Sequence, residues 1–287
     1  DYLTNRLQYV RLNGVLSSVI CTNTGAPQGT VLAPFLFSLY TADCRSTDES
    51  CPLVKFADDT ELVGKISNDE DALYHKQIEN FVNWCDKNYL YLNVSKTKEM
   101  CIDFRKNQRC PKPVYIKGEA VERVETYKYL GVVFDSKLNW KENINSVLKK
   151  VNTRMYCLRK LRSFGVNSGM LVTFYNAVIC SIIVYGSVCW GGNISKFDRG
   201  RLEKIVKKAG HVVGMPLDSF KTLYEKRLLK KLMQILNDPT HPMRHYFDSR
   251  RSNRSGRFLL PKTNTNRYKA SFLPSALSVF NENYNSH

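Results

Sequence analysis

The sequence predicts an α+β fold in which antiparallel hairpins come first, helices follow and a basic tail comes last. Through residues 1–136, short apolar runs flank polar tips, which is typical of β-hairpins. From residue 137 to residue 238, apolar residues recur at helical spacing. Beyond Pro239 the composition shifts to Arg, Ser, Asn and Pro with little periodicity, which predicts a flexible, partly disordered segment.

The first part contains several candidate strands and one candidate helix. Asn13-Gly14 is a typical tight hairpin turn, and Asp58-Asp59 forms a polar tip between two apolar runs. We expect further strands over 98–104, 114–117, 121–124 and 127–134. Ser67-Asn68-Asp69-Glu70 has the pattern of a capping box, so a helix should follow it. The apolar stripe of that helix would be Leu73, Ile78, Phe81, Val82, Cys85 and Tyr89.

A long amphipathic helix is predicted over residues 138–162. Its apolar stripe consists of Leu138, Trp140, Ile144, Val147, Leu148, Val151, Met155, Leu158 and Leu161. The rest of its surface is cationic and includes Lys149, Lys150 and Arg154. Such a face suits a phosphate backbone, although ordinary soluble helices carry lysines too. Two further helices are expected around 201–213 and 220–236, the second ending at Asn237-Asp238-Pro239.

An uncharged stretch covers residues 163–195. Within it, residues 170–190 are apolar enough and numerous enough to span a bilayer. Polar residues such as Thr173, Asn176 and Ser181 dilute the run, and a helix that is apolar on all sides is also typical of the centre of a domain. We expect a buried helix and no stable membrane association.

The net charge of +17 is unevenly distributed along the chain. Residues 1–136 carry 16 Lys and Arg against 18 Asp and Glu, whereas residues 137–287 carry 27 against 8. A positive second half is what a surface that tracks phosphates requires, although a merely solvated surface is an alternative. The nine cysteines include no Cys-x-x-Cys pair, so we expect no zinc site and a reduced compartment, not secretion.

Four short motifs follow one another over about 105 residues. They are Pro27-Gln28-Gly29, Phe56-Ala57-Asp58-Asp59, Asn93-Val94-Ser95-Lys96-Thr97 and Tyr129-Leu130-Gly131. In this order the set resembles the reverse transcriptase of a non-LTR (LINE-type) retrotransposon. The resemblance implies that residues 1–136 form part of a right-hand polymerase palm, an antiparallel sheet plus a helix. It further implies a helical thumb or connection over 137–238 and a basic, flexible tail over 239–287.

The resemblance also implies roles for single residues. Asp58 and Asp59 would be the catalytic acids and would bind Mg²⁺, with Mn²⁺ as an alternative, because carboxylates at a hairpin tip suit a hard cation. Lys96 would serve the departing pyrophosphate as a cation or proton donor, unless it is an ordinary surface lysine. Phe56 would pack beneath the hairpin, beside the primer end. The residues implied in contacts with nucleic acid or nucleotide are Pro27, Gln28, Gly29, Phe56, Tyr129, Leu130, Gly131, Lys149, Lys150 and Arg154.

One part of the family pattern is missing from the sequence. Phosphoryl transfer with two metal ions needs acids from two strands, and no stretch among residues 1–24 matches the motif of the first strand. We therefore expect the carboxyl-terminal part of a polymerase, without fingers, that does not polymerise by itself. Its parent would use an RNA template, a DNA primer or target and dNTPs, as a ribonucleoprotein of the nucleus and cytoplasm.

Two alternatives stay open. The chain could be a non-catalytic RNA- or DNA-binding protein, either a decayed copy or a domesticated one. The region from Tyr129-Leu130-Gly131 into the basic helix also resembles the amino-terminal part of an AlkB-type tRNA-modification protein. No His-x-Asp iron motif accompanies that second likeness.

Overall fold

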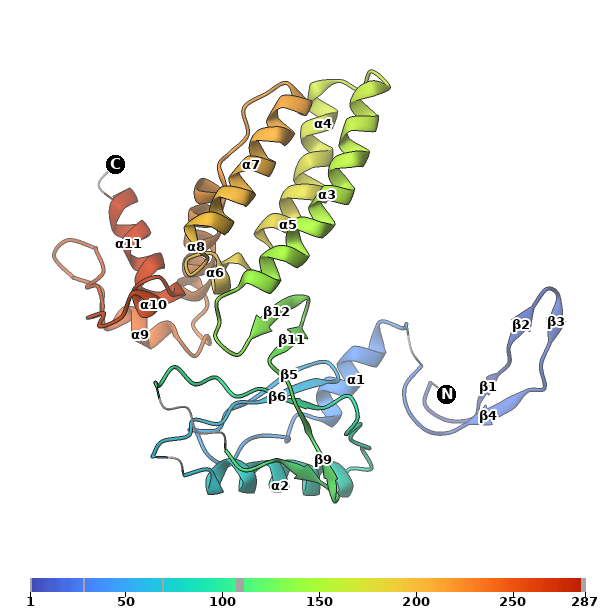
Figure 1. The fold of residues 1–287 in the computed structure, drawn as a ribbon. Coiled ribbons are helices and arrows are strands. Elements are labelled where there is room, and N and C mark those ends of the chain that lie inside the picture. Colours follow the sequence, from blue (N-terminus) through green and yellow to red (C-terminus); the bar gives the residue numbers. More distant parts are fainter. Residues whose placement is uncertain (1, 28, 69, 107–110, 285–287) are drawn as a thin grey trace. The chain divides into compact units, whose positions relative to one another are not determined.

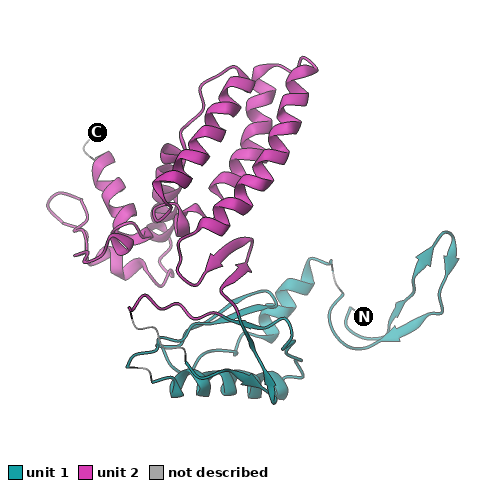
Figure 2. Ribbon diagram, viewed as in Figure 1, with its two compact units in different colours: residues 1–99, 107–123 teal, residues 100–106, 124–287 magenta. Residues whose placement is uncertain are grey.

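The computed structural model describes residues 2–27, 29–68, 70–106 and 111–284. The chain divides into two compact units, coloured separately in Figure 2. Unit 1 comprises residues 1–99 and 107–123, and unit 2 comprises residues 100–106 and 124–287. Helices and small two-stranded sheets make up both units, as the predicted α+β class requires (Figure 1). The hairpin over residues 126–135, predicted as the end of the first domain, falls in unit 2.

Unit 1 consists of hairpins and two helices. Strand β1 (Arg6–Gln8) pairs with β4 (Ile20–Thr22), and β2 (Arg11–Leu12) pairs with β3 (Val15–Leu16) across the predicted turn at Asn13-Gly14. Helix α1 (Leu32–Tyr40) precedes the hairpin of β5 (Leu53–Phe56) and β6 (Asp59–Leu62). Helix α2 (Ala72–Lys87) follows. Strand β7 (Lys98–Glu99) pairs in parallel with β10 (Glu122–Arg123), and β8 (Tyr115–Ile116) pairs with β9 (Glu119–Ala120).

Helix α2 starts later than the capping box predicts. Ser67 and Glu70 instead form an isolated β-bridge, and Asp69 lies outside the described residues. Leu73 and Tyr89 of the predicted apolar stripe are 39% and 86% exposed, so their assignment to the core was wrong. The small core of unit 1 contains Val114, Ile116 and Val121, with Tyr74, Ile78, Val82, Leu92 and Val94 packed against them.

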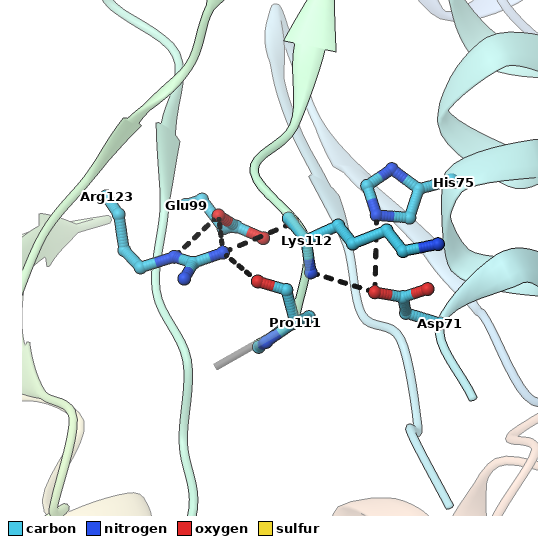
Figure 3. A network of polar contacts seen from close by, with 6 residues as sticks. All are labelled: Asp71, His75, Glu99, Pro111, Lys112 and Arg123. Carbon is cyan, nitrogen blue, oxygen red and sulfur yellow. Dashed lines mark hydrogen bonds and ion pairs between the residues drawn. The ribbon is translucent and has the colours of Figure 1, made fainter. Parts of the chain in front are cut away.

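A network of polar contacts lies at the start of α2 (Figure 3). The carboxylate of Asp71, the residue before the helix, accepts a hydrogen bond from the backbone N–H of Lys112 at 2.8 Å. Buried Glu99 accepts from Nε and Nη2 of Arg123, both at 2.8 Å, and Arg123 also donates to the carbonyls of Pro111 and Lys112. The segment at 111–112 is therefore bound to the start of α2 on one side and to the β7–β10 pair on the other.

Unit 2 is mainly helical. It contains the hairpin of β11 (Thr126–Tyr129) and β12 (Val132–Asp135), then α3 (Lys141–Ser163), α4 (Ser168–Phe174) and a π-helix (Tyr175–Cys180). Helices α5 (Ser181–Val184), α6 (Ser187–Trp190), α7 (Lys196–Val213) and α8 (Phe220–Asn237) follow. The tail contributes α9 (Arg244–Asp248), α10 (Asn266–Lys269) and α11 (Phe272–Tyr284). Helices α3, α4 and α7 run side by side (Figure 1).

The three predicted long helices are present at α3, α7 and α8. Seven residues of the stripe predicted for α3 are buried: Trp140, Ile144, Val147, Leu148, Val151, Met155 and Leu158. Helix α7 begins at Lys196, earlier than predicted, because the Ser195 side chain caps it by accepting from the Asp198 N–H. Leucines of α7 and α8 meet the α3 stripe in one continuous core.

The uncharged stretch is helical but interrupted. The helical segment 168–190 is long enough and apolar enough to cross a membrane, as judged from its length and composition alone. Of its most apolar stretch of 18 residues, 39% is buried inside the protein. Leu171, Tyr175, Ile179 and Ile183 contribute to the core of unit 2. The helix breaks at Tyr185-Gly186, where Gly186 adopts a positive φ. That this stretch stays out of membranes remains a prediction.

The described residues of the tail pack into unit 2, in the segment for which the sequence predicted flexibility. Phe247, Phe258, Ala276 and Leu277 are buried in the core of unit 2. The guanidinium of Arg267 lies 4.0 Å from the ring centroid of Phe104 and donates hydrogen bonds to the carbonyls of Lys137 and Leu138. Aromatic residues spaced without period therefore fix the tail, and a search for periodicity does not detect them.

A buried carboxylate organises the junction between β12 and α3. The side chain of Asp135 accepts hydrogen bonds from the backbone N–H groups of Lys137, Asn139 and Trp140 at 2.9 to 3.2 Å. From the first turn of α3, Asn143 accepts from the N–H of Val133 at 3.1 Å. These bonds satisfy backbone groups that have no partner in a strand or helix.

We expect Asp135→Ala to destabilise unit 2 by roughly 2 kcal/mol, because buried backbone N–H groups lose a charged acceptor. Urea unfolding followed by circular dichroism measures the change. The control is Asp218→Ala, which removes only an exposed ion pair with Lys226 and should cost less than about 1 kcal/mol. Equal losses in the two variants would contradict the role of the junction.

The Asp71 contact should make unit 1 sensitive to acid. The Lys112 N–H, and to a smaller extent the charge of His75, lower the pKa of Asp71 below its ordinary value. The contact therefore stabilises unit 1 above the unfolded pKa of about 3.9 and is lost as the pH falls through the lower, folded pKa. Hydrogen exchange at the Lys112 amide should accelerate in that range.

Two variants test this interpretation. Asp71→Asn should remove most of the pH dependence of protection at Lys112. His75→Gln should keep most of it, because the Lys112 N–H is the larger cause. A pH profile in Asp71→Asn that matches the wild type would rule out the contact as its origin.

Candidate active site

The Asp58-Asp59 pair lies at the tip of the β5–β6 hairpin. Phe56 pairs with Asp59, which leaves Ala57 and Asp58 as the turn, and Ala57 adopts a φ of 53°. A positive φ is strained for alanine, and such strain is found more often at functional sites than elsewhere. Both aspartates are exposed, and neither carboxylate has a hydrogen bond or an ion pair among the described residues.

The two faces of this hairpin differ in exposure. Cross-strand pairing places Phe56 and Asp59 on the same face as Val54 and Glu61, and this face is exposed. Phe56 is 61% exposed, so the expectation that it packs beneath the hairpin was wrong. Partial shielding of the carboxyl from water raises the pKa of Glu61 above its ordinary value, although the residue as a whole is exposed. Glu61, which lies outside the sequence motifs, is a third acid, and alternation along β6 places it on the face of Asp59.

The Asn-x-x-Lys-Thr motif forms a compact turn. The side-chain oxygen of Asn93 accepts from the N–H of Lys96 at 3.1 Å, and the backbone carbonyl of Asn93 accepts from the Thr97 hydroxyl at 2.9 Å. This turn exposes the Lys96 side chain, which is linked to neither Asp58 nor Asp59 by an ion pair in the described structure. Asn93 and Thr97 of the motif are therefore needed to form this turn. The catalytic role of Lys96 stays a prediction.

The Pro-Gln-Gly segment lies just before α1. Gly29 has a φ of 78°, which an L-residue rarely adopts, and its surroundings are open. The Thr30 hydroxyl donates to the carbonyl of Pro27 at 2.9 Å and closes the turn. Gln28 lies outside the described residues.

The Tyr-Leu-Gly motif forms the turn between β11 and β12 in unit 2. Leu130 and Gly131 have φ values of 44° and 84°, the pattern of a type I′ hairpin turn. The hydroxyl of Tyr185 donates to the Leu130 carbonyl at 2.7 Å. A Cβ atom on Gly131 would lie only 3.2 Å from the Tyr185 ring. Glycine is therefore needed both for the backbone conformation and for this close approach.

Tyr185, which contacts the Leu130-Gly131 turn, belongs to a second short motif, Tyr185-Gly186-x-x-x-Trp190. The carbonyl of Tyr185 accepts from Nε1 of Trp190 at 3.0 Å, and Gly186 approaches Val132 so closely that a Cβ would lie 2.9 Å from it. The β11–β12 hairpin therefore packs against the break in the helix at Tyr185-Gly186. Tyr185 and the Tyr-Leu-Gly turn are 55 positions apart in the sequence, so no local pattern indicates that they contact each other.

The cationic residues predicted on α3 are exposed. Lys149, Lys150 and Arg154 all lie outside the buried stripe of the helix. Their position suits contact with a phosphate backbone, which stays a prediction.

The acids can supply only part of a metal site. Asp58 and Asp59 are adjacent, exposed oxygen donors with no ion pair to a Lys or Arg in the described part of the chain, which fits the ligand preference of Mg²⁺. No group of three His, Cys, Asp or Glu that could hold a metal occurs within the described ranges. The remaining ligands of a cation here would have to come from water, substrate phosphates or another segment.

Comparison with known proteins identifies the class. Residues 2–134 match the family model described as "Reverse transcriptase (RNA-dependent DNA polymerase)". The "Probable RNA-directed DNA polymerase from transposon X-element" of Drosophila melanogaster is 30% identical over 200 residues, which covers 67% of this chain and 22% of the relative. The "RNA-directed DNA polymerase from mobile element jockey" of the same organism is 26% identical over 203 residues, again covering 67% and 22%.

Residues 2–134 belong to the reverse transcriptase family. More narrowly, the relatives confirm the predicted type, the reverse transcriptases of non-LTR retrotransposons. The chain spans about a fifth of the length of these relatives. Residues 140–181 also match "Alkylated DNA repair protein alkB homolog 8, N-terminal", the second likeness that the sequence suggested. No solved structure matches the chain.

We expect Gly131→Ala to destabilise unit 2 by about 2 kcal/mol. About 1 kcal/mol comes from the left-handed backbone and about 1 kcal/mol from displacing Tyr185 and its hydrogen bond. Thermal unfolding of the variant measures the loss. Gly165→Ala, with a φ of 74° and open space around the new Cβ, is the matched control and should show the backbone cost alone.

A double-mutant cycle separates the two contributions. Tyr185→Phe should cost about 1 kcal/mol in the wild type and little in Gly131→Ala, where the bond is already broken. Additive losses would show that the turn and Tyr185 are not coupled.

Proposed function

We propose that the chain is part of an RNA-directed DNA polymerase of a non-LTR retrotransposon. In this proposal, residues 1–136 are the distal palm, residues 137–238 the thumb or connection and residues 239–287 a basic tail. The observation that carries the proposal is the exposed Asp58-Asp59 tip, two adjacent carboxylates on a tight hairpin within the segment that matches the reverse transcriptase family. The reaction is nucleotide addition to a DNA primer on an RNA template.

Each motif has a role in this reaction. Asp58, in the turn, and Asp59, at the start of β6, would hold the cations that neutralise the nucleotide phosphates. Lys96 acts on the departing pyrophosphate, and Pro27, Gln28 and Gly29 contact the template and the incoming dNTP. The β11–β12 turn at Tyr129, Leu130 and Gly131 grips the primer, while the cationic face of α3 follows the backbone of the hybrid.

The cofactor in this proposal is Mg²⁺, with Mn²⁺ as a substitute. When bound, it would neutralise the charge of the phosphates during transfer. Asp58 and Asp59 present their oxygens on a short, strained turn, and Phe56 lies beside Asp59 on the exposed face, available to contact the primer end. A further carboxylate, from outside the described acid pair, completes the site. The parent acts as a ribonucleoprotein in the nucleus and cytoplasm.

A non-catalytic RNA- or DNA-binding function is the second candidate. It is favoured by the charge of residues 137–287, with 27 Lys and Arg against 8 Asp and Glu, and by the lack of a three-ligand metal group among the described residues. In this case hybrid binding would survive loss of Asp58 and no nucleotide would be incorporated by any form of the protein.

Primer extension on an RNA template tests the polymerase. We expect residues 1–287 alone to bind the hybrid and add no nucleotide. A form extended upstream through an aspartate-bearing strand, as read from the 5′ end of the transcript, should add nucleotides with Mg²⁺. In that form Asp58→Asn should lower the rate at least about 100-fold, because a metal ligand is lost.

Glu61→Gln is the matched control, since it removes a neighbouring acid from the same strand without touching the tip. It should leave most of the activity. Incorporation that is unaffected by Asp58→Asn would overturn the assignment of the acid pair, and inactivity of every extended form would favour the non-catalytic candidate.

A further inference from the structure

The segment between α9 and α10 forms a closed, arginine-rich loop, here called the arginine loop (residues 250–259). Its ends are joined by a β-bridge between Arg251 and Phe258 and by a hydrogen bond from the Leu259 N–H to the Arg250 carbonyl at 2.8 Å. Inside it, the Ser252 N–H donates to the Arg257 carbonyl at 2.8 Å. In Figure 1 this orange loop extends away from the helices of its unit. Backbone hydrogen bonds within the chain therefore close the loop.

The base of the loop is anchored in the core. Phe258 is 3% exposed and contacts the rings of Phe247 and Phe280 edge-on, at centroid distances of 6.3 and 4.9 Å. Asn281 of α11 accepts from the Phe258 N–H at 2.9 Å and donates to its carbonyl at 2.8 Å. A single side chain thus satisfies both backbone groups at the base of the loop.

The tip of the loop carries unneutralised positive charge. Residues 251–257 read Arg-Ser-Asn-Arg-Ser-Gly-Arg and contain neither an acid nor an apolar side chain. Arg251, Arg254 and Arg257 are exposed, and none of the three has an acidic partner in the part of the chain that the structure describes. The nearest acid in sequence, Asp248, is paired with Arg244 at 3.2 Å.

We propose that the arginine loop is a preformed binding site for the phosphate backbone of a nucleic acid. Guanidinium groups match phosphate oxygens with paired hydrogen bonds, and three of them on a short closed loop can engage neighbouring phosphates together. The loop shares no residue with the acid tip or with the cationic face of α3. The inference rests on the proposed function only in its choice of ligand, an RNA–DNA hybrid.

Charge complementarity favours nucleic acid over a membrane surface. The exposed residues of the tip are all polar, and a membrane-binding loop usually adds apolar side chains that enter the lipid. Leu259 and Leu260 are exposed beside the base of the loop, so binding to anionic lipid is the competing outcome to be tested.

The first experiment measures binding of the full chain to a labelled RNA–DNA hybrid by fluorescence anisotropy at increasing KCl. Arg254→Gln with Arg257→Gln should lower the slope of log K against log salt by about 2, because each phosphate contact contributes about 0.9. Lys262→Gln with Lys269→Gln is the matched control, with the same loss of charge in the tail outside the loop. It should change the slope by less than half as much.

The second experiment tests whether the loop is preformed. Asn281→Ala removes the two hydrogen bonds at the base and leaves the charge unchanged, and we expect it to weaken hybrid binding at least about threefold. Asn283→Ala, on the same helix, is its control and should bind as the wild type does. Circular dichroism checks that the helices persist in both variants.

Three results would overturn the inference. The first is an equal change of the salt slope in the loop variant and in its control. The second is unchanged hybrid binding by Asn281→Ala when its helices are intact. The third is a larger loss of binding to phosphatidylserine vesicles than to the hybrid when the arginines are replaced. None of these measurements requires nucleotide addition. Failure of the polymerase proposal therefore leaves the result for the loop interpretable, and the reverse also holds.

Discussion

The helical unit depends on one buried carboxylate, that of Asp135. Because Asp135 accepts from backbone N–H groups between residues 137 and 140, the chain can turn sharply there with Leu138 and Trp140 at positive φ. Trp140 then packs edge-on against Phe134, and the buried stripe of α3 starts in register with the core. Without that acceptor the turn would bury unpaired donors, which costs more than a single lost hydrogen bond contributes. The same junction fixes β12, and through it the β11–β12 turn beneath Tyr185.

Unit 1 is organised differently, because it buries few of its apolar residues. Helix α1 buries none, and Phe35 and Leu39 on it are 65% and 63% exposed. Val54 and Phe56, on the exposed face of the β5–β6 hairpin, are likewise exposed apolar side chains. Exposed apolar faces of this kind in a soluble domain usually mark contact surfaces. An isolated two-stranded hairpin is also marginally stable, so the geometry of the acid tip depends on what covers these faces.

Sequence patterns anticipated features that rest on local or periodic physics. The stripe of α3 follows from helical spacing, and the turn at Asn13-Gly14 follows from turn chemistry. The turn at Leu130-Gly131, in contrast, divides the segment 127–134, over which a strand was expected. The capping box predicted at Ser67 does not begin α2. Asp71, the residue before the helix, instead accepts from Lys112, 41 residues away, a tertiary contact that no local pattern reports. Phe56 was misplaced because the sequence does not say which face of a hairpin is covered. The contact of Tyr185 with the Tyr-Leu-Gly turn joins residues 55 positions apart and was likewise invisible.

The tail shows most clearly why charge and composition mislead. Arginine, serine and asparagine predict disorder because such residues bury little apolar surface to offset an ordering cost of about 1 to 2 kcal/mol per residue. Here three phenylalanines and one asparagine pay that cost at the base of the arginine loop during folding. A ligand that meets an ordered loop need not supply the ordering energy again, so the same arginines bind more tightly than they would on a free chain. What decides between a frayed tail and a binding site is therefore Phe258 and its neighbours, not the arginines themselves.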